Sequence, residues 1–229
     1  MKKILNTNSL KIIAIITMVL DHIAYLFVPV SSVFYFIFRI IGRICAPVMF
    51  YSLANGFFYT RSRIKYACRL LFFAILSQVP YSLFVGNQIF LINNYNILFT
   101  LFLAFMCLFI IYSKSMNLFL KITFNILLIG LSYFCDYGLF GIVLVFIFAF
   151  SKSYKIKFIL YSIASIAYVA IKSILTNSFI SFVIFLGLFL AIPLLNLYNE
   201  KKGKINLKYL FYVFYPLHFI VLIIIKTLL

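Results

Sequence analysis

Five ionisable side chains lie deep inside apolar stretches of this sequence, namely Asp21, His22, Arg39, Arg43 and His218. The whole chain has only three acidic residues and two histidines, so their placement there is unusual. An ionisable group at membrane depth is costly unless it faces a partner or a wet cavity. Histidine can carry protons near neutral pH, and arginine binds carbonyl or anionic groups. These residue types predict a reaction site within a membrane.

Helix geometry places these side chains at similar depths. With the rise of an α-helix, His22 lies roughly 18 Å from the start of its apolar run. Arg39 and Arg43 lie roughly 9 and 15 Å from the start of the next run, which enters from the opposite side. His218 lies about 15 Å from the cytoplasmic end of the last run. We therefore expect these side chains to line one cavity.

The two arginines are four residues apart and share one helix face. Asp21 is the only carboxylate at comparable depth, so we expect it to neutralise one arginine and to leave the other for a substrate. A purely structural bridge between the first two helices is the alternative for Asp21. Adjacent helical residues point about 100° apart, so Asp21 and His22 are not predicted to form a His-Asp dyad.

Lys11 precedes His22 by eleven residues, which is about three helical turns, so both lie on one face roughly 16 Å apart. A ligand with an anionic end at the cytoplasmic surface and a reactive end at mid-membrane would fit this pair. An ordinary flanking lysine that reaches the interface is the alternative for Lys11.

The composition is that of an integral membrane protein. The chain has 229 residues, of which 66% are hydrophobic, and a mean hydropathy of +1.19. We predict an all-α, polytopic helix bundle that forms a single domain over residues 1–229. The net charge of +17 comes from short clusters between apolar runs, so nucleic acid is not expected as a partner. The four cysteines have no metal-ligand spacing, and no metal site is predicted.

The apolar runs predict about nine transmembrane helices. Their ranges are 10–29, 33–59, 64–84, 95–113, 117–135, 138–151, 156–174, 178–198 and 208–228. Every second connection is basic, and Lys2 and Lys3 lie on the same side as these connections. The basic residues of the connections are Arg61, Arg63, Lys65, Lys114, Lys152, Lys155, Lys157, Lys201, Lys202, Lys204 and Lys208. The positive-inside rule therefore predicts a cytoplasmic N-terminus.

Several blocks of the sequence resemble the TraX proteins, a family of membrane acetyltransferases. The blocks are LKIIAIITMVLDHIAYLF (10–27), RIIGRICAPVMFYSLANGFFYTRSRIKYACRLLFFAILSQVPYSL (39–83), NILFT (96–100), Asp136 with Gly138 and Gly141, and FYPLHF (214–219). The first block is also similar to a wider superfamily of transmembrane acyltransferases, which have a basic residue, ten intervening residues and a histidine on the first helix. Lys11 and His22 occupy those positions here.

The resemblance implies acetyl-CoA as an acyl donor from the cytoplasm, and a peptide, glycan or lipid acceptor at or outside a bacterial cytoplasmic membrane. His22 is expected to act as the general base, supported by Asp21, Arg43 and His218. The donor is expected to contact a set of basic residues: Lys11, Arg39, Arg61, Arg63 and Arg69. A proton-coupled transporter and a non-catalytic scaffold for pilus or surface-polymer assembly are the alternatives.

Overall fold

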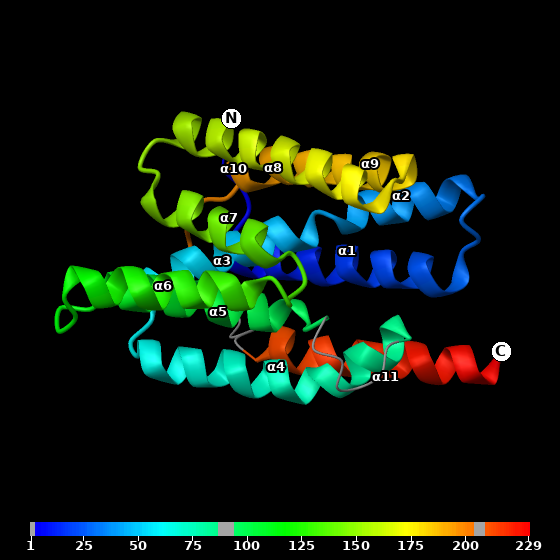
Figure 1. The fold of residues 1–229 in the computed structure, drawn as a ribbon. Helices are drawn as coiled ribbons and strands as arrows, with labels where there is room; N and C mark the ends of the chain where they lie inside the picture. Colours follow the sequence, from blue (N-terminus) through cyan, green and yellow to red (C-terminus); the bar gives the residue numbers. More distant parts are fainter. Residues whose placement is uncertain (1–2, 87–93, 204–208) are drawn as a thin grey trace. The chain divides into compact units, whose positions relative to one another are not determined.

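The computed structural model describes residues 3–86, 94–203 and 209–229, and Figure 1 shows the ribbon. All the named elements of these residues are helices, and β-type backbone pairing is limited to two isolated bridges among them. The elements are α1 (Thr7–Phe27), α2 (Val33–Gly42), α3 (Cys45–Tyr59), α4 (Arg63–Val85), α5 (Ile97–Ile111), α6 (Leu118–Ser132), α7 (Gly138–Phe150), α8 (Tyr154–Thr176), α9 (Phe179–Phe185), the 3₁₀ helix η1 (Leu186–Leu190), α10 (Ala191–Asn196) and α11 (Leu210–Leu228).

These elements confirm the predicted all-α polytopic bundle, and each of the nine predicted apolar segments is helical. Six of the segments are long and apolar enough to cross a membrane, when α2 with α3 and α9 with α10 are each taken as one segment. The other three, α5, α6 and α7, have 15, 15 and 13 residues. Lys2, Lys204 and Lys208 of the basic clusters lie outside the described residues. The cytoplasmic N-terminus and the single domain stay predictions.

The second predicted segment, 33–59, is one apolar span, but its helix is interrupted at Arg43, which corrects the expectation of a single continuous helix. The N–H groups of Arg43 and Ile44 donate to carbonyls three residues back, at 3.2 and 3.1 Å, instead of four. Pro47 explains the break, because it has no N–H to donate to the Arg43 carbonyl and its ring clashes with that turn. The sequence therefore places Arg43 at a joint between α2 and α3.

A second interruption divides the predicted helix 178–198. A 3₁₀ segment, η1, separates α9 from α10. The buried hydroxyl of Tyr161 on α8 donates to the Leu188 carbonyl in η1 at 2.6 Å. A 3₁₀ segment leaves helix carbonyls less well satisfied, so this bond stabilises the irregular backbone. It also ties η1 to α8.

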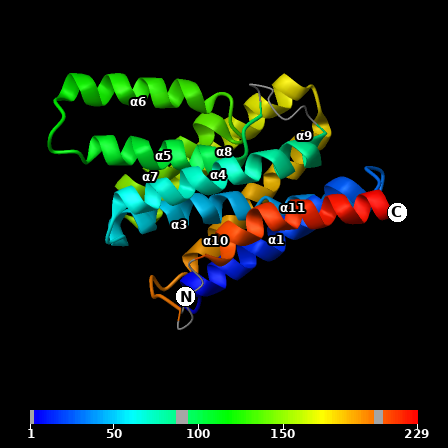
Figure 2. The same ribbon diagram turned by 90° about the horizontal axis from the view of Figure 1, so that it is seen from below.

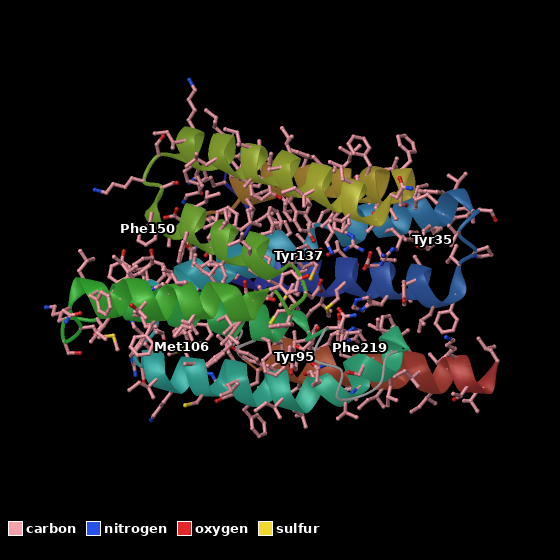
Figure 3. All side chains as sticks on the ribbon, viewed as in Figure 1. Tyr35, Tyr95, Met106, Tyr137, Phe150 and Phe219 are labelled. Carbon is pink, nitrogen blue, oxygen red and sulfur yellow. The ribbon has the colours of Figure 1, made fainter. Side chains whose placement is uncertain are left out.

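The chain forms two compact units, and each is described by itself. The first consists of residues 1–52, 152–211 and 224–229. In it α2 contacts α1 on one side and α9 with η1 on the other, as Figure 1 shows. Tyr35 on α2 (Figure 3) is buried with Ala24 of α1 and Ile184 of α9, so these three helices share an apolar core.

The second unit consists of residues 53–151 and 212–223. Its centre is α5, which contacts α4, α6 and α7, and Figure 2 shows α5 beside α6. Ten of the fifteen α5 residues are buried, in agreement with a helix that is apolar on all sides. Phe219 of α11 packs against Phe84 of α4 with ring centroids 4.8 Å apart. Aromatic contacts therefore join α11 to α4.

Asn96 joins α4 to α5 through a buried polar network. Its amide donates to the Ala74 carbonyl at 2.8 Å and to the Gln78 side-chain oxygen at 2.9 Å. The Gln78 amide in turn donates to the Asn94 carbonyl and to the Ser82 hydroxyl, each at 3.1 Å. Asn96 also caps α5, because its oxygen accepts from the Leu98 N–H.

We expect Asn96→Ala to lower the free energy of unfolding by at least about 2 kcal/mol, because it removes a helix cap and leaves buried polar groups unsatisfied. Thermal unfolding in detergent measures this change. Asn125→Ala is the matched control, since that amide donates only to the Lys121 carbonyl of its own helix turn. Equal melting temperatures for the two variants would contradict the assignment.

Candidate functional site

Asp21, Arg39 and Arg43 meet where α1 contacts α2. Asp21 Oδ2 lies 2.8 Å from Arg39 Nη1, and Asp21 Oδ1 lies 3.2 Å from Arg43 Nη2. The three side chains are only 11–15% exposed. The helical spacing of the arginines explains the geometry, because residues four apart lie one above the other on one face. Both guanidinium groups can therefore reach one carboxylate.

The double contact corrects the expectation that Asp21 would neutralise one arginine and leave the other for a substrate. Both arginines bind the same carboxylate, so the cluster holds two positive charges and one negative charge. The surplus charge is shared, and it is buried. The Arg39 Nε is also buried and has no hydrogen-bond partner among the described residues. An anion or a developing oxyanion would be stabilised beside such a cluster.

Aromatic rings surround the two guanidinium groups. Arg39 Cζ lies 5.4 Å from the ring centroid of Tyr25 and 5.8 Å from that of Tyr35. Arg43 Cζ lies 4.9 Å from the ring centroid of Phe185 on α9. The negative faces of aromatic rings stabilise cations within about 6 Å. Apolar ring surface beside the charges lowers the local dielectric constant, which strengthens electrostatic interactions within the cluster.

Gly42 allows α2 to approach α1 at this point. A Cβ atom at Gly42 would lie 2.7 Å from Asp21 Cγ and Oδ1, and closer still to Asp21 Cβ. On the other side of α2, a Cβ atom at Gly187 of η1 would overlap the Ile40 carbonyl group. Two glycines therefore bring three backbones together around the arginines. Neither glycine was predicted from the sequence, although the position of Gly42 next to Arg43 was an available signal.

His22 and Lys11 lie on a different face of α1 from Asp21. Asp21 is buried against α2, whereas His22 and Lys11 are both half-buried. A single helix, Thr7–Phe27, carries both residues, so the predicted shared face about three turns apart holds. The carboxylate of Asp21 binds the two arginines, in agreement with separate roles for Asp21 and His22.

His218 belongs to the second unit and is 5% exposed. Its Nδ1 lies 3.1 Å from the Phe214 carbonyl oxygen of the preceding turn. A carbonyl can only accept, so Nδ1 carries the proton and Nε2 is the basic nitrogen of the neutral ring. The rings of Phe214 and Phe219 lie against the imidazole, with centroids 5.6 and 4.0 Å away. We predicted that His218 lines one cavity together with residues of the first unit, and this stays a prediction.

The other three arginines that are expected to contact the donor lie in the second unit, before or within α4. Arg61 is exposed. Arg63 Nε donates to the Phe57 carbonyl at 3.4 Å, and its guanidinium lies 4.2 Å from the Phe57 ring centroid, so it caps the end of α3. Arg69 has a buried Nε without a hydrogen-bond partner among the described residues. Donor contact by these arginines stays a prediction.

A multi-span helical architecture with a buried ion-pair cluster of one carboxylate and two guanidinium groups defines a class, that of polytopic membrane proteins with a buried polar cluster. The family is more specific. The TraX protein family model matches residues 6–226, and the chain belongs to the TraX family. The resemblance carried by the sequence blocks is thereby confirmed.

A curated relative comes from Dichelobacter nodosus and is named probable fimbrial assembly protein FimC, serogroup H1. It is 34% identical over 222 residues, which cover 91% of each chain. The likeness therefore extends over nearly the whole of both proteins. No solved structure matches this chain.

Proposed function

We propose that the protein transfers an acetyl group from cytoplasmic acetyl-CoA to an amine or hydroxyl acceptor at or outside a bacterial cytoplasmic membrane. The observation that carries the proposal is the buried, net positive cluster of Asp21, Arg39 and Arg43, which lies on α1 and α2 next to His22 in the chain. Membership of a family of membrane acetyltransferases supports it. The acceptor would be a peptide N-terminus, a glycan or a lipid.

In this reaction the acceptor nitrogen or oxygen attacks the thioester carbonyl carbon. His22 takes the proton of the attacking group, and the carbon–sulfur bond then breaks. The proton passes to the sulfur, so that the products are an acetylated acceptor and free coenzyme A. Arg43, held by Asp21, stabilises the oxyanion that forms on the carbonyl oxygen. His218, with Nε2 as its basic nitrogen, would serve as a second proton carrier.

The basic residues along the path would hold the donor. Lys11, Arg61, Arg63 and Arg69 would contact its phosphate groups at the cytoplasmic face, and Arg39 would contact its carbonyl end. The proposed path follows the face of α1 from Lys11 to His22, which is about three helical turns long. The pantetheine arm of coenzyme A is an extended chain that suits such a path.

A second candidate function follows from the relative's name. The name of the relative, a fimbrial assembly protein, favours a role in pilus assembly. In that role this chain would act as a membrane scaffold and would catalyse no reaction. The two functions differ in what they require of His22. A scaffold tolerates replacement of that imidazole, whereas acyl transfer does not.

We expect His22→Ala to reduce acetyl transfer at least about 100-fold, because general base catalysis typically contributes a factor of that size. The measurement is the transfer of radiolabelled acetyl from acetyl-CoA to material in membranes that contain the protein. His22→Gln removes the titratable group with less change in volume, and it should lose activity to the same extent.

Ile12→Ala is the matched control, because Ile12 is an exposed residue of the same helix. Membrane insertion and melting temperature are compared for all variants before activity is scored. Undiminished transfer in His22→Ala would disprove the catalytic role. Substrate uptake without acyl chemistry in the wild-type protein would favour the transporter alternative.

A further inference from the structure

Two lysines from distant parts of the chain lie against one tyrosine ring in the first unit. Lys3 Nζ is 4.3 Å from the ring centroid of Tyr154, and Lys157 Nζ is 5.4 Å from the same centroid. Lys157 Nζ is also 5.5 Å from the ring centroid of Tyr51. The two ammonium groups are therefore within roughly 10 Å of each other, a distance at which like charges still repel.

The backbone holds Lys3 in this position. The Leu5 N–H donates to the Leu197 carbonyl at 2.9 Å, and the Asn199 N–H donates to the Leu5 carbonyl at 2.8 Å. The Thr7 N–H donates to the Lys201 carbonyl at 3.0 Å. These bonds fix the segment that precedes α1 against the segment that follows α10, as Figure 1 shows near the N-terminus. The convergence of the lysines is thus built into the fold.

Acidic side chains do not cancel these charges. Glu200 is the carboxylate that acts electrostatically on Lys157. Among the described residues, neither lysine forms an ion pair within 4.0 Å with it. With Glu200 included, the group keeps a net charge of one positive unit. The other two acidic side chains are Asp21, which is bound to two arginines, and Asp136, which belongs to the second unit.

The Tyr154 hydroxyl and the first turn of α8 add further hydrogen-bond donors at the same place. The Tyr154 hydroxyl is buried and has no hydrogen-bond partner among the described residues. Tyr154 is also the first residue of α8, and the side chain of the capping residue Ser153 makes no capping bond. The first N–H groups of a helix favour an anion, and lysine is a common phosphate ligand. The Tyr154 hydroxyl, the first N–H groups of α8 and the two lysines are hydrogen-bond donors that suit a phosphate group.

We infer that Lys3, Lys157 and Tyr154 form a phosphate-binding site, which holds the nucleotide end of a coenzyme A thioester. The inference rests on the proposed function, and it adds residues of the first unit to the phosphate contacts proposed above. The headgroup of an anionic lipid offers the same chemistry as a nucleotide phosphate. The experiment below distinguishes a nucleotide phosphate from a lipid headgroup as the bound group.

The test uses the full chain in nanodiscs of phosphatidylcholine, with adenosine 3′,5′-bisphosphate as the probe of the nucleotide end. We expect the double variant Lys3→Gln/Lys157→Gln to weaken binding of this probe at least about tenfold, since each lysine loses a charge-assisted contact. Lys152→Gln/Lys155→Gln is the matched control, because it removes two exposed lysines next to the same tyrosine. Melting temperatures verify that both variants are folded.

A second arm measures the lipid source. Nanodiscs that contain phosphatidylglycerol are prepared without nucleotide, and the lipid retained by the protein is measured by native mass spectrometry. Selective loss of this lipid in Lys3→Gln/Lys157→Gln, with unchanged nucleotide binding, would support the phosphate site and assign it to a lipid headgroup. If neither ligand is affected more than in the control variant, the site does not exist.

Failure of the proposed function gives a different result. If the wild-type protein binds the nucleotide through these lysines but transfers no acetyl group, the site stands and the reaction is wrong. If acetyl transfer proceeds and the Michaelis constant for acetyl-CoA is unchanged in Lys3→Gln/Lys157→Gln, the reaction stands and the nucleotide assignment is wrong.

Discussion

Asp21→Asn is expected to lower the free energy of unfolding by about 3–5 kcal/mol, because it leaves two buried guanidinium groups without their carboxylate. The side chains involved are only 11–15% exposed, so water cannot replace the lost partner. The measurement is a melting curve followed with a thiol-reactive dye. Cys45 and Cys107 are buried and report unfolding when they become accessible.

The matched test is the double variant Asp21→Asn/Arg39→Gln. It restores the net charge of the cluster to one positive unit, as in the wild-type protein, so we expect it to regain part of the lost stability. Contacting residues show coupling energies of about 0.5–3 kcal/mol in such cycles. Additive effects of the two substitutions would show that the Asp21 to Arg39 ion pair contributes nothing to the fold.

Gly42→Ala is expected to reduce acetyl transfer by about 100-fold, the scale of loss that follows a displacement of about 1 Å at a reacting group. The added methyl group would lie 2.7 Å from Asp21 Cγ, so α2 must move away from α1. Overpacking of this kind also costs about 1–3 kcal/mol of stability. The measurements are the melting temperature and the rate of labelled acetyl transfer.

Gly130→Ala provides the control for Gly42→Ala. Gly130 lies in α6, and beyond its own helix backbone no atom of the described residues lies within 4 Å of the place its Cβ atom would take. The helix propensity of alanine should then raise stability slightly, by about 0.5–1 kcal/mol. Wild-type activity and melting in Gly42→Ala would contradict the close approach of the two helices.

The sequence predicted the helical segments well, because twenty-residue apolar runs and basic connections are strong local signals. It also predicted that Asp21 turns away from His22 and towards the arginines. Local patterns cannot show how many partners a carboxylate has, which depends on how closely two helices approach. The contact of Asp21 with both arginines was therefore missed.

The interruptions of the helices were missed for a related reason. Pro47 is visible in the sequence, but prolines are also tolerated inside membrane-spanning helices, so the apolar run reads as continuous. The role of Arg63 as a cap of α3 depends on how the chain turns after Tyr59. Likewise, the meeting of Lys3 with Lys157 depends on the pairing of segments nearly 200 residues apart, which no local pattern encodes.

The close contacts at Gly42 and Gly187 also bear on motion. Because α2 touches α1 at one glycine and η1 at the other, sliding of α2 past either neighbour would force backbone atoms and side chains to overlap. Tightly packed backbones move together as rigid bodies. We therefore expect α1, α2 and η1 to move as one body, with slow amide exchange along α2, so that any opening for substrate takes place elsewhere.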